Sequence, residues 1–207
     1  RTITVQAGCI LQHIHELVEQ EGLYFPLSLA AKGSCTIGGN LATNAGGLNV
    51  LRYGTMREQC LGLQIVLSDG TILNQLTPLR KDNTGYDLKN LFIGSEGTLG
   101  IITAACLKLV SKPIARATTI AVTDKFEHAL ELLDSLQHRS GDQVESFEIM
   151  PKALLDIVYK QFPDYAQPIQ PASGFILLME ISSSKSDELE IDDSGKPALQ
   201  NLMERFL

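Results

Sequence analysis

The spacing of hydrophobic and polar positions predicts alternating strands and helices in the first half of the chain. Thr2 to Val5 alternates as a short strand does, and the apolar residues from Ile10 to Val18 share one face of a helix. Gly22 is expected to end that helix, because glycine readily takes the left-handed conformation that closes helices. Cys60 to Gln75 alternates on both sides of Asp69-Gly70, which predicts two strands joined by a hairpin turn.

The segment that follows predicts a short helical turn and then a long strand. We expect the turn within Leu88 to Ile93 and the strand from Ile101 to Val110. The strand is expected to stop before Pro113, because proline cannot donate a backbone hydrogen bond to a sheet. Strands mixed with a few helices in this way are typical of an α+β fold.

A second pattern begins near Ala115, where strands and helices alternate more regularly. Asp124 is the expected N-cap of one helix, with Glu127 three residues further on, and Pro151 is the expected first residue of another. Residues 182–195 are acidic and rich in serine, which predicts a solvated loop. The expected strands are 118–122, 144–149 and 175–181, and a last amphipathic helix is expected over 199–206.

The break between the two patterns predicts two domains. Lys112-Pro113 interrupts the pattern, and 207 residues suit two modest domains. We therefore expect one domain over residues 1–113 and a second over residues 114–207. The chain starts with Arg1 rather than methionine and ends within the last expected helix, so we expect an internal fragment of a longer protein.

Composition narrows the classes of function. The chain is 44% hydrophobic and 20% charged, as soluble globular proteins are, and its net charge of −7 argues against a nucleic-acid partner. No apolar run reaches the ~20 residues of a membrane-spanning helix, and the start shows no signal-peptide pattern. The four cysteines are widely spaced without a C-x-x-C pair, which predicts reduced and mostly buried thiols.

The most informative motif is an uncharged run from Thr36 to Gly47. Two pairs, Gly38-Gly39 and Gly46-Gly47, remove side chains, so that backbone N–H groups can approach a ligand closely. Between the pairs lie three neutral hydrogen-bonding residues, Asn40, Thr43 and Asn44. This combination suits an extended anionic ligand such as a dinucleotide, although a purely structural loop has the same composition.

A second glycine motif covers Gly94 to Ile102. Its glycines are spaced G-x-x-G-x-x-G and a strand is expected to follow, whereas the Rossmann fingerprint needs G-x-G-x-x-G between a strand and a helix. The chain also lacks the G-x-x-x-x-G-K-[ST] sequence of P-loop proteins. Both of these common nucleotide-binding motifs are therefore excluded.

Several motifs, taken in order, resemble one family of flavoproteins. The glycine run is preceded by PLSLAAKGSC from Pro26 and followed by RYG from Arg52, NTGYDL from Asn83 and LFIGSEGTLGIIT from Leu91. In this order and spacing they resemble the FAD-binding (PCMH-type) domain of the vanillyl-alcohol-oxidase-type flavoproteins. Within that superfamily the chain is similar to the D-2-hydroxyglutarate dehydrogenase and D-lactate dehydrogenase group.

The resemblance implies a domain organisation within the α+β class. Residues 1–113 would form the C-terminal portion of the FAD-binding domain. Residues 114–207 would form the N-terminal portion of a ferredoxin-like cap domain, which binds the substrate.

The resemblance also implies which residues border FAD. The first glycine run matches the family segment around the ribityl, pyrophosphate and flavin portions, and Asn44 is expected to face the ring. The second motif matches the segment that contacts the adenosine half, although Glu96 would also suit a local role in capping N–H groups. The expected cofactor-binding residues are Pro26, Ser34, Gly38, Gly39, Asn40, Thr43, Asn44, Gly46, Gly47, Gly54, Glu96, Gly97, Gly100 and Ile101.

No catalytic residue or metal ligand is expected in this chain. The resemblance places the catalytic histidine and the metal-binding histidines beyond it, and none of the four histidines present falls in a matching motif. A divalent metal, where the protein binds one, is therefore expected outside this fragment. Arg52 has two interpretations: it binds a substrate carboxylate through its guanidinium group, or it forms a surface ion pair.

The resemblance implies an FAD-dependent dehydrogenase that oxidises a D-2-hydroxy acid, D-2-hydroxyglutarate or D-lactate, to the 2-keto acid by hydride transfer to flavin N5. The electron acceptor is expected to be a quinone or an electron-transfer protein, because no NAD fingerprint appears. The fragment alone is expected to be inactive. Two alternatives stay open: a flavin-free remnant or interaction module with the same fold, and another FAD oxidase of the superfamily.

The remaining expectations concern assembly and location. A homodimer is compatible with the resemblance, and neither a nucleic-acid partner nor a transmembrane segment is expected. The protein is expected in the cytoplasm of a bacterium or, in a eukaryote, in the mitochondrial matrix.

Overall fold

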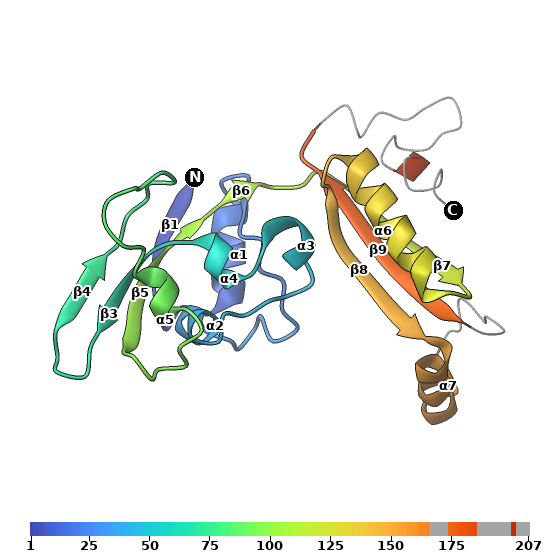
Figure 1. The fold of residues 1–207 in the computed structure, drawn as a ribbon, viewed down its shortest axis with the longest axis horizontal. Coiled ribbons are helices and arrows are strands. Elements are labelled where there is room, and N and C mark those ends of the chain that lie inside the picture. Colours follow the sequence, from blue (N-terminus) through green and yellow to red (C-terminus); the bar gives the residue numbers. More distant parts are fainter. Residues whose placement is uncertain (166–173, 186–199, 202–207) are drawn as a thin grey trace. The chain divides into compact units, whose positions relative to one another are not determined.

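The computed structural model describes residues 1–165, 174–185 and 200–201 (Figure 1). The backbone divides into two compact units, Arg1–Lys112 and Pro113–Leu207. Helices and strands occur in both units, which confirms the predicted mixture of the two. In the described part of the chain, no helix is long and apolar enough to cross a membrane.

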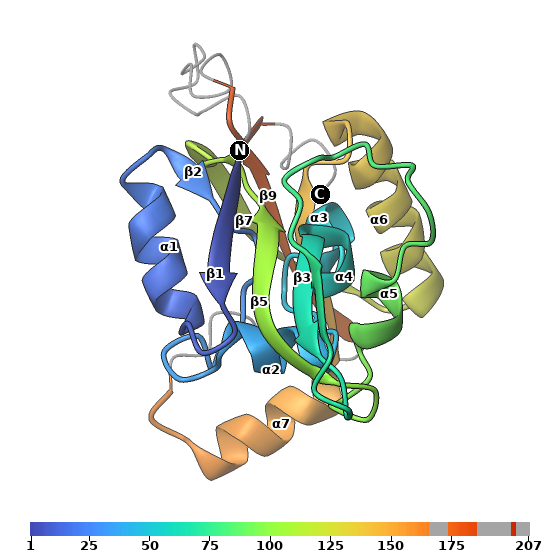
Figure 2. The ribbon, with the colours of Figure 1, turned by 90° about the vertical axis from the view of Figure 1, so that its left-hand side faces the viewer.

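An antiparallel sheet with the strand order β1-β5-β3-β4 forms the centre of the first unit. Its strands are β1 (Thr2–Gln6), β3 (Cys60–Val66), β4 (Ile72–Gln75) and β5 (Ile101–Lys108). The predicted hairpin is present: Val66 lies opposite Ile72, and Gly70 has a φ of 87° in the turn. Figure 2 shows β5 between β1 and β3, so the strand that follows the second glycine motif lies inside the sheet.

Short helices and a small two-stranded ladder complete this unit. The longest helix, α1 (Leu11–Glu19), buries Leu11, Ile14 and Val18 of the predicted apolar face, whereas Leu17 is exposed. The other elements are β2 (Leu23–Tyr24), which pairs with β6 (Val110–Ser111), and the helices α2 (Ile37–Ala42), α3 (Val50–Tyr53), α4 (Met56–Gln59) and α5 (Lys89–Phe92).

The hydrophobic core of this unit anchors the helix that carries the first glycine pair. Ile37 and Leu41 of α2 are fully buried, and they lie on one face of the helix because they are four residues apart. This face packs near β5, and Figure 2 shows α2 beside the beginning of that strand. Gly38 is half-buried against Ala7, whereas Gly39 is exposed.

The second unit is a sheet covered by a helix. Its strands are β7 (Ala115–Thr123), β8 (Val144–Pro151) and β9 (Phe175–Ser183), in the order β7-β9-β8 with antiparallel pairing. The helix α6 (Phe126–Ser140) contributes Ala129 and Leu136 to the core, and α7 (Lys152–Gln161) follows β8. A strand inserted between the two strands of a β-α-β unit is typical of ferredoxin-like folds.

Two predicted helix starts in this unit are each wrong by one residue. The N-cap of α6 is Lys125 rather than Asp124, because the Thr123 hydroxyl bonds the backbone of Lys125 and delays the helix. Pro151 is the N-cap of α7 rather than its first residue, since it still pairs with Phe175 in the sheet. The predicted solvated loop over 182–195 is wrong at its start, because Ser182 and Ser183 are buried in β9, where they pair with Arg116 and Ala115. Residues 186–195 of that prediction and the helix over 199–206, apart from 200–201, lie outside the described residues.

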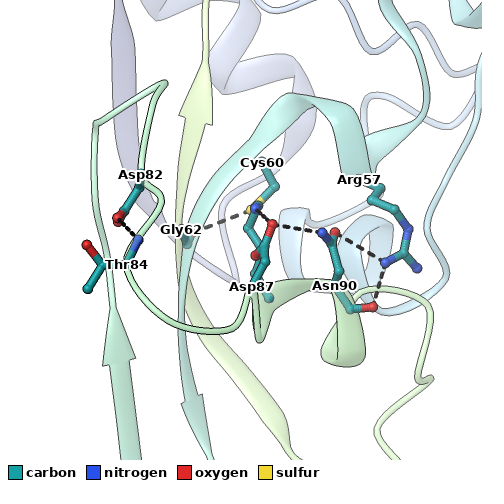
Figure 3. A network of polar contacts seen from close by, with 8 residues as sticks. Arg57, Cys60, Gly62, Asp82, Thr84, Asp87 and Asn90 are labelled. Atoms are coloured by element: carbon teal, nitrogen blue, oxygen red, sulfur yellow. Dashed lines mark hydrogen bonds and ion pairs between the residues drawn. The ribbon is translucent and has the colours of Figure 1, made fainter.

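The cysteines are free thiols, and Cys60 gives the first unit a testable pH dependence. Burial raises the pKa of Cys60 from 9.0 to about 12, and its S–H donates to the carbonyl of Gly62 (Figure 3). Above pH 9 the unfolded chain loses this proton while the folded chain keeps it, so stability falls as the pH rises. Between pH 8 and pH 10, the free energy of unfolding measured in urea should fall by about 1.3 kcal/mol more in the wild type than in Cys60→Ala. Equal losses in the two proteins would contradict the prediction.

Candidate functional site

The first glycine motif folds into α2, a helix that its composition disfavours. Thr36 is the N-cap, and its hydroxyl accepts a hydrogen bond from the N–H of Gly39. Glycine costs about 1 kcal/mol in a helix interior relative to alanine, and α2 contains two glycines in six residues. The buried pair Ile37 and Leu41 offsets this cost by anchoring the helix in the core.

The second glycine motif closes the other end of α2. The N–H groups of Gly94 and Glu96 donate to the carbonyls of Leu41 and Ala42, each at 3.0 Å. These carbonyls lie in the last turn of α2, where a helix leaves its backbone acceptors without helical donors, and the Leu41 carbonyl also accepts from the N–H of Asn44 at 3.0 Å. The two motifs are therefore joined by backbone hydrogen bonds although more than forty residues separate them in the sequence.

The backbone between Gly94 and Gly97 is unusual. Gly94, Glu96 and Gly97 all have positive φ, at 84°, 51° and 78°. Such a conformation is uncommon for glutamate, and backbone outliers of this kind cluster at functional sites. Asn44, in the first motif, is a further non-glycine residue with positive φ, at 48°.

The two motifs border a cavity of about 260 Å³ that is open to solvent. It is lined by Gly38, Gly39, Ala42, Ser95, Glu96, Gly97, Gly100, Ile101 and Ile102. Six predicted cofactor-binding residues therefore share one cavity: Gly38, Gly39, Glu96, Gly97, Gly100 and Ile101. Sequence reasoning missed Ala42, Ser95 and Ile102, although each of them adjoins a predicted residue in the sequence.

Three of the seven glycines in the two motifs, and Gly54 after the first motif, have a packing reason for lacking a side chain. A Cβ on Gly38 would lie 2.7 Å from that of Ala7, and one on Gly100 would lie 2.9 Å from the Val66 carbonyl oxygen. A Cβ on Gly47 would lie only 1.9 Å from the carbonyl oxygen of Ser28. Gly54, with a φ of 75°, is pressed against the Glu58 side chain.

Gly39 and Gly97 are different, because little of the protein lies where their side chains would be. A Cβ on Gly39 would meet only the Thr36 hydroxyl at 3.4 Å, and one on Gly97 only Ile101 at 4.0 Å. Packing therefore leaves Gly39 unexplained, and Gly97 is required by its positive φ alone. Both face the cavity, where the missing side chains leave room for a ligand.

The other predicted residues of the first motif are engaged within the protein. The Oδ1 of Asn44 accepts from the N–H of Arg57 at 3.0 Å, and the Thr43 hydroxyl donates to the Gly39 carbonyl at 3.0 Å. The Asn40 amide contacts the Cys35 sulfur at 3.5 Å, and Asn40 is buried. In Gly46 a Cβ would meet the Val50 side chain at 3.2 Å. None of these four residues lines the cavity.

Three predicted residues precede or follow the first motif. The carbonyl of Pro26 accepts from the buried Asn49 amide, and the Ser34 hydroxyl donates to the Ala31 carbonyl. The Arg52 guanidinium lies 5.1 Å from the centre of the Tyr53 ring, in cation–π geometry. Pro26, Ser34 and Arg52 do not line the cavity either.

The chemistry of the cavity is neutral apart from one carboxylate, that of Glu96. No lysine or arginine lines it, and the exposed side chain of Ile101 adds an apolar surface. The walls thus suit a neutral group with an apolar face and hydroxyl or amino donors. In the described residues, no group of three or more His, Cys, Asp or Glu side chains is placed to hold a metal ion.

Comparison with known families finds one family that matches the segment containing α2. The family described as FAD binding domain matches residues 1–75, which include the first glycine motif. Residues 1–75 are thus similar to this FAD-binding family. The family match thus confirms the predicted class of domain and FAD as its cofactor.

Curated relatives extend the similarity to nearly the whole chain. The chain is 44% identical to D-2-hydroxyglutarate dehydrogenase, mitochondrial, of Bos taurus over 188 residues, which is 91% of this chain and 34% of the relative. It is also 44% identical to the Rattus norvegicus protein of the same name over 205 residues, 99% of this chain and 37% of the relative. The chain thus spans about a third of the length of these relatives.

A solved structure supports the fold. An alkyldihydroxyacetonephosphate synthase matches with a TM-score of 0.67 over 87% of this chain and 34% of that chain, at 21% sequence identity. At this identity the similarity concerns the fold alone. The resemblance to the vanillyl-alcohol-oxidase-type group is confirmed by the family match together with the curated relatives.

Proposed function

We propose that the chain is part of an FAD-dependent dehydrogenase that oxidises a D-2-hydroxy acid to the 2-keto acid. The observation that carries the proposal is the cavity between the two glycine motifs. It lies beside α2, within the residues that match an FAD-binding family. The curated relatives named D-2-hydroxyglutarate dehydrogenase support this substrate class, with D-2-hydroxyglutarate ahead of D-lactate.

The residues present fit FAD. Gly39 and Gly97 leave open the places where side chains would obstruct a ligand, and no contact within the protein accounts for the absence of a side chain at Gly39. Glu96 can accept hydrogen bonds from sugar hydroxyl or adenine amino groups, and Ile101 offers an apolar face to a ring. Since a carboxylate without a nearby cation repels phosphate, we assign this cavity to a neutral part of the adenosine half.

The chain's own residues would bind and orient the cofactor rather than move protons. When bound, FAD supplies a ring that accepts a hydride at N5. The base that takes the hydroxyl proton of the substrate is expected outside this chain, as is any divalent metal. A quinone or an electron-transfer protein is the proposed acceptor, and binding of substrate carboxylate by Arg52 stays a proposal.

The two units would divide these tasks. We assign residues 1–113 to the C-terminal portion of the FAD-binding domain and residues 114–207 to the first portion of the cap domain. The β7-β9-β8 sheet with its split connection supports the second assignment. The mitochondrial names of the relatives support the mitochondrial matrix among the two expected locations.

An anaerobic visible absorption spectrum of the protein at its natural length tests the proposal. We expect a bound-flavin spectrum that bleaches on addition of D-2-hydroxyglutarate and stays unchanged with the L-acid. A flavin that remains oxidised with both acids would support FAD as the cofactor and contradict D-2-hydroxyglutarate as the substrate. A colourless protein that cannot be reconstituted with FAD would favour the flavin-free module instead.

A further inference from the structure

Arg57 contacts both glycine motifs, although it lies in neither of them. Its backbone N–H donates to Oδ1 of Asn44 at 3.0 Å, in the first motif. Its Nη2 donates to the carbonyl of Ile93 at 2.6 Å, directly before Gly94 of the second motif. Its Nη1 donates to the backbone carbonyl of Asn90 at 2.5 Å and to Oδ1 of Asn90 at 3.3 Å. We call this set of contacts the Arg57 bridge.

The bridge ends in a larger polar network. Figure 3 shows the guanidinium of Arg57 directed at Asn90, whose amide reaches Asp87 on the other side. The Nδ2 of Asn90 donates to Oδ2 of Asp87 at 2.9 Å, and Asp87 also pairs with Lys89. The side chain of Asn90 is thus held by Arg57 on one side and by Asp87 on the other.

The second motif begins directly beside this contact. A Cβ on Gly94 would lie 3.4 Å from both Nη2 of Arg57 and Cβ of Asn44, so this segment rests against the bridge. The next residues carry the positive φ values and the hydrogen bonds to Leu41 and Ala42. A strained segment keeps its conformation only when its surroundings hold it in place.

We infer that Arg57 is a positioning residue that sets the width of the FAD cavity by tying the second glycine motif to the first. The inference rests on the proposed function, because it concerns the binding of FAD. Lysine cannot replace arginine here, since one ammonium group cannot reach the Asn90 and Ile93 carbonyls with the fork geometry of a guanidinium. The role depends on the geometry of the guanidinium rather than on its positive charge, because its acceptors are neutral carbonyl and amide oxygens.

Arg57→Lys in the protein at its natural length tests the inference, with Arg80→Lys as the matched control. Arg80 is an exposed arginine that lines a cavity together with Arg57 and Asn90 but makes none of the hydrogen bonds of the bridge. We expect FAD affinity, measured by flavin fluorescence, to fall about tenfold in Arg57→Lys because carbonyl acceptors lose their donors. The control should bind FAD within about twofold of the wild type.

Hydrogen exchange of the apo-protein gives a readout that needs no flavin. The N–H groups of Gly94 and Glu96 should exchange about tenfold faster in Arg57→Lys, while amides of β1 and β3 keep their wild-type rates. Should the lysine variant not accumulate, Asn90→Ala gives the same comparison with about a threefold effect on FAD affinity. An alkylguanidinium ion, unlike an alkylammonium ion, should restore FAD binding to Arg57→Ala.

The outcomes separate this inference from the proposed function. A wild-type protein that does not bind FAD overturns the proposed function and this inference together. A wild-type protein that binds FAD, with Arg57→Lys binding equally well and exchanging equally slowly at 94–96, overturns the inference alone. Faster exchange spread over the whole first unit would assign Arg57 a general role in stability and would also overturn it.

Discussion

Gly47→Ala should destabilise the first unit by about 3 kcal/mol, whether or not FAD is present. The added Cβ would lie 1.9 Å from the carbonyl oxygen of Ser28 and 2.7 Å from its carbon, both backbone atoms that cannot rotate away. The same oxygen accepts the N–H of Leu48 at 3.2 Å, so relief of the clash also breaks a hydrogen bond. Urea unfolding of the apo-protein, followed by circular dichroism, measures the loss.

Gly46→Ala is the matched control, one residue away in the same motif. Its added Cβ would meet the Cγ2 of Val50 at 3.2 Å, and this contact is relieved by a small side-chain shift. We expect it to cost less than about 1 kcal/mol. Equal stabilities of the two variants would show that packing against Ser28 does not explain Gly47.

The strands of this protein could be predicted because their signals are local. Alternation over Cys60–Val66 and the Asp69-Gly70 dipeptide is enough to place the hairpin, and β3 and β4 lie within the predicted span. The helix α2 gives the opposite case, since the sequence around Gly38, Gly39 and Asn40 favours a loop. Burial of Ile37 and Leu41 makes it a helix, and that burial depends on strands distant in the sequence.

The site could be predicted in part, for a similar reason. The order of the motifs indicates which segments meet, and six of the predicted residues line one cavity. The sequence does not distinguish a glycine such as Gly47, which a backbone carbonyl requires, from Gly39, which faces open space. Arg57 carries no sequence signal either, because its partners at Asn90 and Ile93 are backbone carbonyls, which every residue has.

Gly39→Leu should abolish most FAD binding without unfolding the protein. The exposed position accepts a side chain, and leucine favours a helix over glycine by nearly 1 kcal/mol, so the apo-protein should become slightly more stable. The same side chain fills the space above the cavity and should weaken FAD about 100-fold, which corresponds to roughly 2.7 kcal/mol. Gly39→Ala should likewise raise the stability of the apo-protein and lower its affinity for FAD, each by a smaller amount.

Gly8→Leu is the control for this experiment, because no atom lies within 4 Å of a Cβ placed on Gly8 and it does not line the cavity. It should leave FAD affinity unchanged, as measured by equilibrium dialysis of the protein at its natural length. Opposite changes in stability and affinity at Gly39 cannot come from damage to the fold, because such damage would lower both. A Gly39→Leu variant that binds FAD normally would show that the cavity is not part of the FAD site. Neither packing nor a ligand would then explain the glycine at position 39.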